Sequence, residues 1–219
     1  MSDKAIILLS GGIDSATCLY WTKSMNYDLY ALTFNYYDRW RKEIEATKEL
    51  CERANVKQLI EIDVRFIKEA FNVLGYEGEY IKDNDKRWPF YIPAKNLMFY
   101  SMAAHHAEYM NAKWIVGGHN KHDVEFFADA TSDYLGTLNR LLREGCMFCD
   151  GVNYEIILPL VDMDRLEVIE LALKLKVPLE LTWSCHVKTE KHCGECYGCA
   201  SRNQAFNTLG IEDPAEYIQ

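Results

Sequence analysis

The amino-acid sequence predicts an α/β fold, in which a doubly wound, mostly parallel sheet of five strands precedes a small C-terminal segment. Short apolar runs of strand length alternate along the chain with stretches that repeat apolar residues at helical spacing. Parallel strands need crossover connections, which helices provide. Because 49% of the 219 residues are hydrophobic, the chain can bury a substantial core. We therefore expect a main domain at residues 1–180 and an appended segment at residues 181–219.

The first part of the chain contains three predicted strands and two predicted helices. Residues 5–9 are apolar and lie between a charged residue and glycines, as in a fully buried strand. Ile44, Leu50 and Cys51 recur at the spacing of a helix face. In order, we expect a strand at 5–9, a helix at 15–24, a strand at 28–36, a helix at 39–55 and a strand at 56–64.

The alternation continues after an interruption. Residues 67–74 favour one more helix, and residues 75–95 form a long polar and aromatic stretch that is typical of an active-site lid. Beyond it, we expect helices at 96–112, 131–145 and 164–176, with strands at 113–119 and 154–160.

A glycine-rich loop follows the first strand and reads S-G-G-I-D-S at residues 10–15. Glycines let a ligand approach the backbone, and the first N–H groups of a helix bind anions, phosphate above all. The chain has neither G-x-x-x-x-G-K-[ST] nor a G-x-G-x-x-G after the first strand, which excludes two other nucleotide-binding loops. The alternative is an ordinary glycine turn in which Asp14 or Ser15 caps the helix.

Four cysteines near the C-terminus have the spacing of a metal site. Cys193, Cys196 and Cys199 form C-x-x-C-x-x-C, and Cys185 precedes Cys193 by eight positions. Four thiolates can complete a tetrahedral shell around Zn²⁺ that leaves no position for substrate. We predict one structural zinc ion here, with an iron–sulfur cluster as the alternative.

The other cysteines receive less specific interpretations. Cys146 and Cys149 form another C-x-x-C, which is compatible with a redox pair, a partial metal site or two thiols beside a turn. Cys18 and Cys51 fall on the apolar faces of predicted helices, so we interpret them as core residues.

Charge and composition favour a small-molecule substrate. The chain has 24 Lys and Arg against 33 Asp and Glu, a net charge of −9, so it lacks the overall positive field that attracts nucleic acid. The N-terminus resembles no targeting segment, and its apolar run is too short to span a bilayer. We therefore expect a cytoplasmic protein, in which structural disulfides are unusual.

The motifs together carry a family resemblance. The S-G-G-x-D-S loop resembles the pyrophosphate loop (PP-loop) of the N-type ATP pyrophosphatases, which split ATP between its α and β phosphates. Combined with the four cysteines, it resembles the 7-cyano-7-deazaguanine synthase family over nearly the whole chain. The family pattern also matches Phe34, Arg39, the E-I-E at residues 43–45 and Asn96.

The resemblance implies a fold, a reaction and partners. The fold is a Rossmann-like sheet of the adenine nucleotide alpha hydrolase type, and the cofactors are ATP with Mg²⁺. The enzyme is an ATP-dependent ligase that converts 7-carboxy-7-deazaguanine and ammonia to 7-cyano-7-deazaguanine, a precursor of queuosine and archaeosine, and releases AMP and pyrophosphate. The family tends to form homodimers.

The resemblance also implies roles for individual residues. The residues assigned to ATP binding are Ser10, Gly11, Gly12, Ile13, Asp14, Ser15, Ala16 and Phe34. The residues assigned to catalysis are Asp14, Ser15, Arg39 and Lys95. The residues assigned to the deazapurine are Lys95, Asn96, Asp123 and Asp129.

Several of these roles have structural alternatives. Arg39 and Lys95 are candidates for neutralising phosphate or carboxylate charge, and the alternative for each is a solvated surface cation. Asp123 and Asp129 are candidates for reading the N–H groups of the base, or for capping a helix near residues 131–132.

The sequence departs from the family pattern in places that concern the substrate. Lys95 replaces an arginine and loses its planar fork. Asp38 and Trp40 also differ, and residues 122–131 lack the serine, glycine and proline of the family's D-x-S-G-Y-P-D-C. The alternative functions are a thiolation-type PP-loop enzyme that modifies tRNA, against which the acidic balance argues, and a synthase paralogue that joins an activated deazapurine carboxylate to another amine.

Overall fold

The computed structural model of the protein describes residues 3–36, 39–67, 92–146 and 154–218. Residues 68–74 of the helix expected at 67–74 lie outside the described residues, and so do residues 75–91 of the stretch at 75–95.

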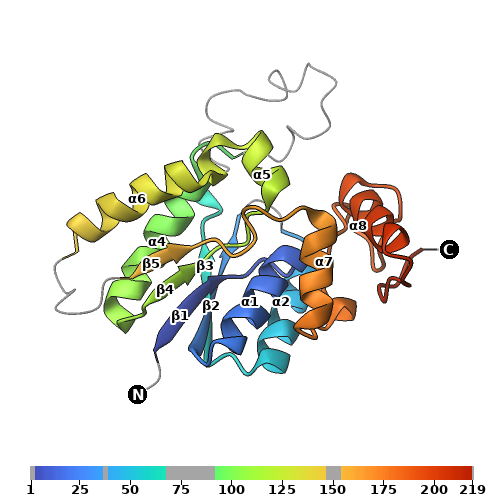
Figure 1. The fold of residues 1–219 in the computed structure, drawn as a ribbon, viewed down its shortest axis with the longest axis horizontal. Helices are drawn as coiled ribbons and strands as arrows, with labels where there is room; N and C mark the ends of the chain where they lie inside the picture. The colour runs from blue at the N-terminus through green and yellow to red at the C-terminus, as the bar shows by residue number, and fades with distance from the viewer. Residues whose placement is uncertain (1–2, 37–38, 68–91, 147–153, 219) are drawn as a thin grey trace.

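A five-stranded parallel sheet forms the centre of the molecule, as predicted. The strand order is β3-β2-β1-β4-β5, so the chain moves outward from β1 to β3 and then returns to the other side of β1 (Figure 1). This reversal leaves a crevice between the carboxyl ends of β1 and β4, which is where open α/β sheets bind their ligands. The strands are β1 (Lys4–Leu8), β2 (Asp28–Asn35), β3 (Gln58–Asp63), β4 (Trp114–Val116) and β5 (Glu155–Ile157).

Helices cover both faces of the sheet and bury two apolar clusters. One face packs against α1 (Ile13–Ser24), α2 (Arg41–Ala54) and α7 (Arg165–Lys174), and the other against α4 (Lys95–Met110) and α6 (Ser132–Glu144). Neighbouring residues of β1 illustrate the alternation: Ile7 belongs to the first cluster, Ile6 to the second, and both are fully buried. The doubly wound prediction is therefore confirmed.

Two helices and two short turns were not among the predicted elements. The additional elements are α5 (Lys121–Phe126), α8 (Tyr197–Thr208), η3 (Ala128–Ala130) and η4 (Leu179–Leu181). A capping box holds the start of α5, because the Asn120 side chain accepts from the N–H of Asp123 while the Asp123 carboxylate accepts from the N–H of Asn120. Strand β4 is shorter than expected, since its pairing ends at Val116 before the G-G-H-N sequence at residues 117–120.

The C-terminal segment packs against the beginning of the main domain. The N–H of Trp183 donates to the carbonyl of Gly11 at 2.9 Å, and Trp40 Nε1 donates to the carbonyl of Thr189 at 2.9 Å. Inside the segment, the buried guanidinium of Arg202 donates to both carboxylate oxygens of Asp213. The expected boundary at residue 180 falls within η4 and stays a prediction.

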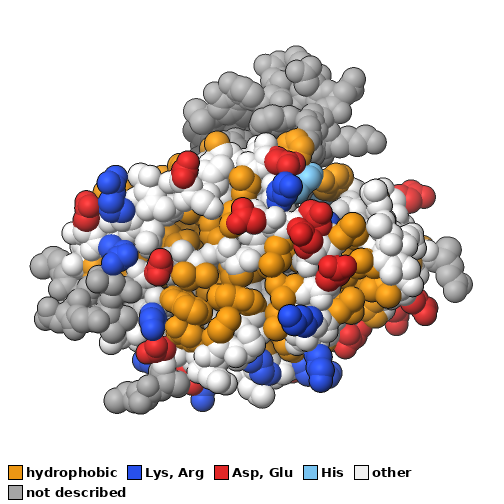
Figure 2. All heavy atoms as spheres, viewed as in Figure 1, with side chains coloured by type: hydrophobic (Ala, Val, Ile, Leu, Met, Phe, Trp, Pro, Cys, Tyr) orange, Lys and Arg blue, Asp and Glu red, His pale blue; other side chains and the backbone are white. Residues whose placement is uncertain are grey.

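One face of the molecule carries charged side chains of both signs. On the face drawn in Figure 2, basic and acidic side chains are interspersed among apolar ones, so the described part of this face carries no continuous basic track. Among the described helices, none combines the length and apolar character that crossing a membrane requires.

Candidate functional site

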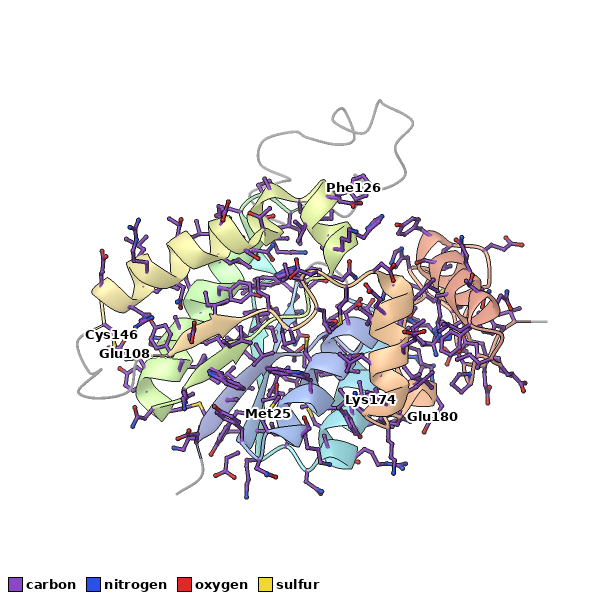
Figure 3. The ribbon with its side chains drawn as sticks, in the orientation of Figure 1. Met25, Glu108, Phe126, Cys146, Lys174 and Glu180 are labelled. Atoms are coloured by element: carbon purple, nitrogen blue, oxygen red, sulfur yellow. The ribbon has the colours of Figure 1, made fainter. Side chains whose placement is uncertain are left out.

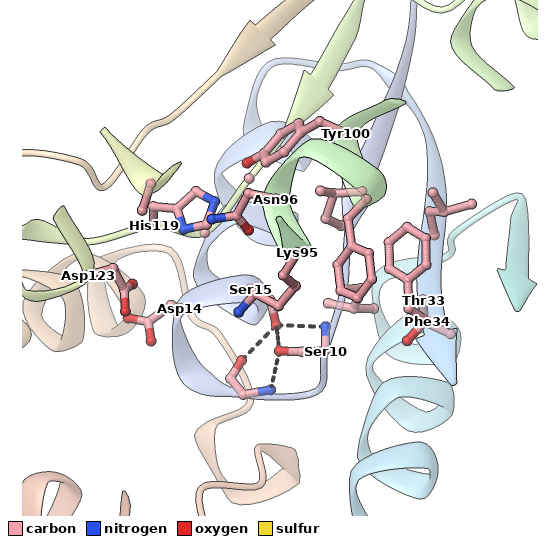
Figure 4. Close-up of a pocket in the computed structure, with 18 of the residues that line it drawn as sticks. Ser10, Asp14, Ser15, Thr33, Phe34, Lys95, Asn96, Tyr100, His119 and Asp123 are labelled. Atoms are coloured by element: carbon pink, nitrogen blue, oxygen red, sulfur yellow. Dashed lines mark hydrogen bonds between the residues drawn. The ribbon is translucent and has the colours of Figure 1, made fainter. Parts of the chain in front are cut away.

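The loop after β1 is closed by its two serines. Ser15 Oγ accepts from the N–H of Ser10 at 3.2 Å, lies 3.1 Å from Ser10 Oγ and donates to the carbonyl of Gly12 (Figure 4). Gly12 is the N-cap of α1 and offers no side-chain hydrogen bond, so neither Asp14 nor Ser15 is the cap residue. The first N–H groups of α1 therefore face the loop without a side-chain acceptor, which is the arrangement that binds a phosphate.

Gly11 fits this loop because it has no side chain. Its φ of +92° is unfavourable for other residues, and a Cβ there would lie 2.8 Å from the carbonyl oxygen of Glu43 in α2. We expect Gly11→Ala to lower the free energy of unfolding by about 1–3 kcal/mol.

Chemical denaturation measures this effect, with Gly136→Ala as the matched control. A Cβ at Gly136, inside α6, would meet no atom within 4 Å, so alanine should raise the stability by about 0.5–1 kcal/mol. Wild-type stability of Gly11→Ala would contradict the loop geometry.

A cavity of about 260 Å³ lies over the carboxyl ends of the strands, beside this loop. Figure 4 shows the loop serines between Phe34 on one side and His119 with Asp123 on the other. The cavity therefore has an aromatic end near β2 and a polar end near β4. The predicted site residues that line it are Ser10, Gly12, Asp14, Ser15, Phe34, Arg39, Lys95, Asn96, Asp123 and Asp129.

Three of the residues predicted to bind ATP do not line the cavity. Gly11 contacts α2, as described above, and the side chains of Ile13 and Ala16 lie in the apolar core. The N–H of Ala16 donates to the carbonyl of Gly12 and so belongs to the helix. Phe34 does line the cavity, where its ring stacks on Phe99 with centroids 3.9 Å apart.

Asp14 stands at the centre of a charged network. Arg165 Nη1, from the start of α7, lies 2.8 Å from both carboxylate oxygens of Asp14, and Asn120 Nδ2 donates to one of them at 3.2 Å. The Asp14 carboxylate, chiefly, raises the pKa of Arg165. Neither Arg165 nor Asn120 was predicted, although each follows the carboxyl end of a strand, β5 and β4 respectively.

Asp123 adds a second carboxylate to the polar end. Burial, and after it the negative charge of Asp14, raises the pKa of the Asp123 carboxyl. The two carboxylates lie side by side in Figure 4 and repel each other in the free protein.

Arg39 is buried behind the loop. Its side chain is only 4% exposed, and it donates to the carbonyl of Ser10, to Thr33 Oγ1 at 2.6 Å and to Thr47 Oγ1 at 2.9 Å. It also forms an ion pair with Glu43. We infer that Arg39 holds the loop in place, because each of its three guanidinium nitrogens already donates to an acceptor in the protein.

Lys95 and Asn96 begin helix α4 beside Asp129. The Asn96 side chain is buried and donates to the carbonyl of Asp129 at 3.1 Å, while an Asp129 carboxylate oxygen accepts from the N–H of Asn96 at 3.3 Å. Asp129 thus serves the start of α4, whereas the cap of α6 is Thr131, which accepts from the N–H of Tyr134. Lys95 lines the cavity near its centre (Figure 4).

Two further residues at the polar end were missed by the sequence reasoning. His119 follows β4, and burial lowers its pKa to about 4, with a smaller contribution from Lys95, so its imidazole is neutral at pH 7. Tyr100, from α4, lies 5.8 Å from His119 between ring centroids. Both residues line the cavity.

The four predicted cysteines come together as one cluster. The sulfur atoms of Cys185, Cys193, Cys196 and Cys199 all lie within 4.8 Å of one another. Two of the separations are 3.9 Å, close to the ~3.8 Å between ligands of a tetrahedral Zn–S shell and far from a disulfide bond. Backbone N–H groups of residues 187, 193 and 196 point at the sulfurs, as they do toward thiolates. The donor set therefore fits a metal ion.

The remaining cysteines lie elsewhere. Cys146, just beyond α6, is on the opposite side of the molecule from α8 (Figure 3), and Cys149 lies outside the described residues. Cys18 and Cys51 are buried in the core, as expected.

Comparisons with known proteins agree with this geometry. The family "Queuosine biosynthesis protein QueC" matches residues 4–210. A protein from Campylobacter jejuni named 7-cyano-7-deazaguanine synthase is 34% identical, and one of the same name from Methanobrevibacter smithii is 32% identical; in both cases 99% of each chain is covered. The solved structure of an NMN synthetase from Francisella tularensis has the same fold, with a TM-score of 0.55 at 20% identity over 96% of this chain and 79% of that one.

The family match spans both the loop and the cysteine cluster, and the two relatives align over nearly their whole length. The chain therefore belongs to the family of the queuosine biosynthesis protein QueC.

Proposed function

We propose that the protein converts 7-carboxy-7-deazaguanine and ammonia to 7-cyano-7-deazaguanine, with ATP as the activating substrate. The observation that carries the proposal is the cavity over the β1–β4 crevice, which combines a phosphate-binding loop with a carboxylate pair. Membership of the QueC family and the names of the relatives support the choice of substrate.

ATP is expected to lie across the middle of the cavity. Its phosphates would meet the N–H groups at the start of α1 and the Ser10 and Ser15 hydroxyls. Its adenine would then occupy the aromatic end beside Phe34, and the deazapurine would take the polar end near β4. Lys95, which lies between the two ends in Figure 4, would neutralise charge as pyrophosphate leaves.

Asp14 and Asp123 are the residues that would hold Mg²⁺, so Asp123, which the resemblance assigns to the deazapurine, receives a different role in this proposal. Mg²⁺ binds through one or two carboxylates together with substrate phosphates, and a dication between these two groups would remove their mutual repulsion. Bound there, the ion supplies charge neutralisation for the phosphates.

The chemistry requires two activations because neither oxide nor hydroxide is a good leaving group. The deazapurine carboxylate attacks the α-phosphorus of ATP, forming an acyl adenylate and releasing pyrophosphate. Ammonia displaces AMP and gives the amide with loss of a proton. The amide oxygen then attacks the α-phosphorus of a second ATP and releases a second pyrophosphate, and loss of AMP and protons leaves the nitrile. One site can serve both adenylations, since both need the same positioning.

The cysteine cluster completes the proposal with one structural Zn²⁺. A closed shell of four sulfurs leaves no open coordination position, so the ion would stabilise the C-terminal segment rather than take part in the reaction. The homodimer rests on the family resemblance, and the cytoplasmic location stays a prediction from the sequence.

Product analysis tests the proposed function. We expect the protein, incubated with ATP, Mg²⁺, ammonium and 7-carboxy-7-deazaguanine, to form the nitrile together with two AMP and two pyrophosphate per nitrile, measured by mass spectrometry and a pyrophosphate assay. Omitting the deazapurine should abolish AMP formation.

Other products would change the assignment. An acyl adenylate or amide that goes no further would favour a paralogue that joins the carboxylate to another amine. A lack of any substrate-dependent AMP would reject the proposal.

A further inference from the structure

Tyr100, a residue that lines the cavity at its polar end, carries a buried hydroxyl whose hydrogen-bonding capacity is unused. Tyr100 is fully buried, and its Oη has no hydrogen-bond partner among the residues that the structure describes. Among the described residues, Asn35 Oδ1 is likewise buried without a partner, but the lining of the cavity includes Tyr100 and not Asn35. Leaving a buried hydroxyl unpaired costs about 1–3 kcal/mol, so such a group at a ligand cavity calls for an explanation.

The backbone makes room for this hydroxyl. A Cβ at Gly117 would lie only 1.6 Å from Tyr100 Oη, so only glycine at the end of β4 lets the tyrosine reach this position. The next residue, Gly118, packs against the loop, because a Cβ there would lie 3.1 Å from the N of Ser15. The Tyr100 hydroxyl therefore packs against Gly117, and the next residue in the chain packs against the loop at residues 10–15.

The Tyr100 hydroxyl is an uncharged donor beside an uncharged imidazole. Burial raises the pKa of Tyr100 well above its ordinary value, so the proton stays on the oxygen at any physiological pH. The neighbouring His119 is neutral as well. Two uncharged hydrogen-bonding groups suit the polar edge of an uncharged ring. The charged phosphates would instead be bound by the N–H groups at the start of α1 and by the cation Lys95.

We propose that the Tyr100 hydroxyl donates a hydrogen bond to an acceptor atom of the deazapurine ring and so helps to select that substrate. The inference rests on the proposed function, because that function places the deazapurine at the polar end. In this role Tyr100 contributes binding to the substrate and leaves ATP binding unaffected.

Tyr100→Phe tests this role because the ring is kept and only the oxygen is lost. Calorimetric titration with 7-carboxy-7-deazaguanine, in the presence of Mg²⁺ and α,β-methylene-ATP, should show about three- to tenfold weaker binding. Titration with α,β-methylene-ATP alone should be unchanged. The melting temperature of the free variant should rise by about 2–4 °C, because an unpaired buried hydroxyl is removed.

Tyr154→Phe is the matched control. Tyr154 is 2% exposed and lies in the same apolar cluster, but it does not line the cavity. Its variant should bind both ligands like the wild type.

Three results would overturn the inference while leaving the proposed function intact: unchanged deazapurine binding by Tyr100→Phe, weaker binding of the ATP analogue, or a lower melting temperature. Wild-type protein that binds the ATP analogue but not the deazapurine would reject both the inference and the proposed function.

Discussion

Asp14→Asn is expected to lower the rate of AMP formation by about 100-fold or more. The substitution keeps the size of the side chain but removes the negative charge that Arg165 and Asn120 orient toward the polar end of the cavity. An amide is a weak ligand for Mg²⁺, and the repulsion with Asp123 that a cation would relieve is lost. Substrate-dependent release of pyrophosphate measures the effect.

Two further variants separate charge from structure. Asp133→Asn removes a carboxylate from the first turn of α6, as Asp14→Asn does in α1, and should leave the rate unchanged. Arg165→Gln breaks the same ion pair but keeps the carboxylate, so its loss of rate should be much smaller. If Arg165→Gln and Asp14→Asn were equally slow, the ion pair rather than a metal ion would explain the role of Asp14.

Removal of the metal from the cysteine cluster is expected to lower the melting temperature by more than about 10 °C. Structural zinc contributes on the order of 10 kcal/mol or more to the folding of small zinc domains, and here the four sulfurs tie Cys185 to the start of α8. Affinity for α,β-methylene-ATP should fall in parallel, since the segment holds the loop through Trp183 and Gly11. Chelation followed by thermal unfolding, limited proteolysis and nucleotide titration measures these effects.

Cysteine variants provide the controls for this experiment. Cys196→Ser should reproduce the effect of chelation, whereas Cys51→Ala, which removes a core cysteine of α2, should retain one metal ion per chain by elemental analysis. Unchanged stability and protease resistance after complete metal removal would show that the cluster is not a structural metal site. If elemental analysis found iron and the protein showed a visible charge-transfer band, the four cysteines would be assigned to an iron–sulfur cluster instead of zinc.

The fold was largely predictable because its elements are regular and local. Most strands show as short apolar runs, and the alternation with helices requires parallel pairing, so the sheet follows from pattern and connection rules. Helix α5 was missed because six residues carry no apolar periodicity. Its only local signal was Asn120 three positions before Asp123, a spacing that a capping box uses.

The site was predictable where its residues are contiguous and not where they are distant. The loop at residues 10–15 and the cysteines were recognised by spacing. Arg165 meets Asp14 from 151 positions away, and nothing in the local sequence around either residue indicates that contact. The available signal was topological: residues that follow β4 and β5 reach the same edge of a parallel sheet as those that follow β1.

The hydrogen bond between the N–H of Trp183 and the carbonyl of Gly11 also bears on how the protein is made. The phosphate loop is among the first parts of the chain to be synthesised, yet one of the contacts that holds it comes from the last fifth. Contacts between such distant parts of a chain form late in folding, because a long loop must first be closed. A nascent chain on the ribosome therefore carries the loop sequence for most of translation without its finished shape. The proposed ability to bind ATP would be acquired only when the C-terminal segment has emerged and folded around its proposed metal ion.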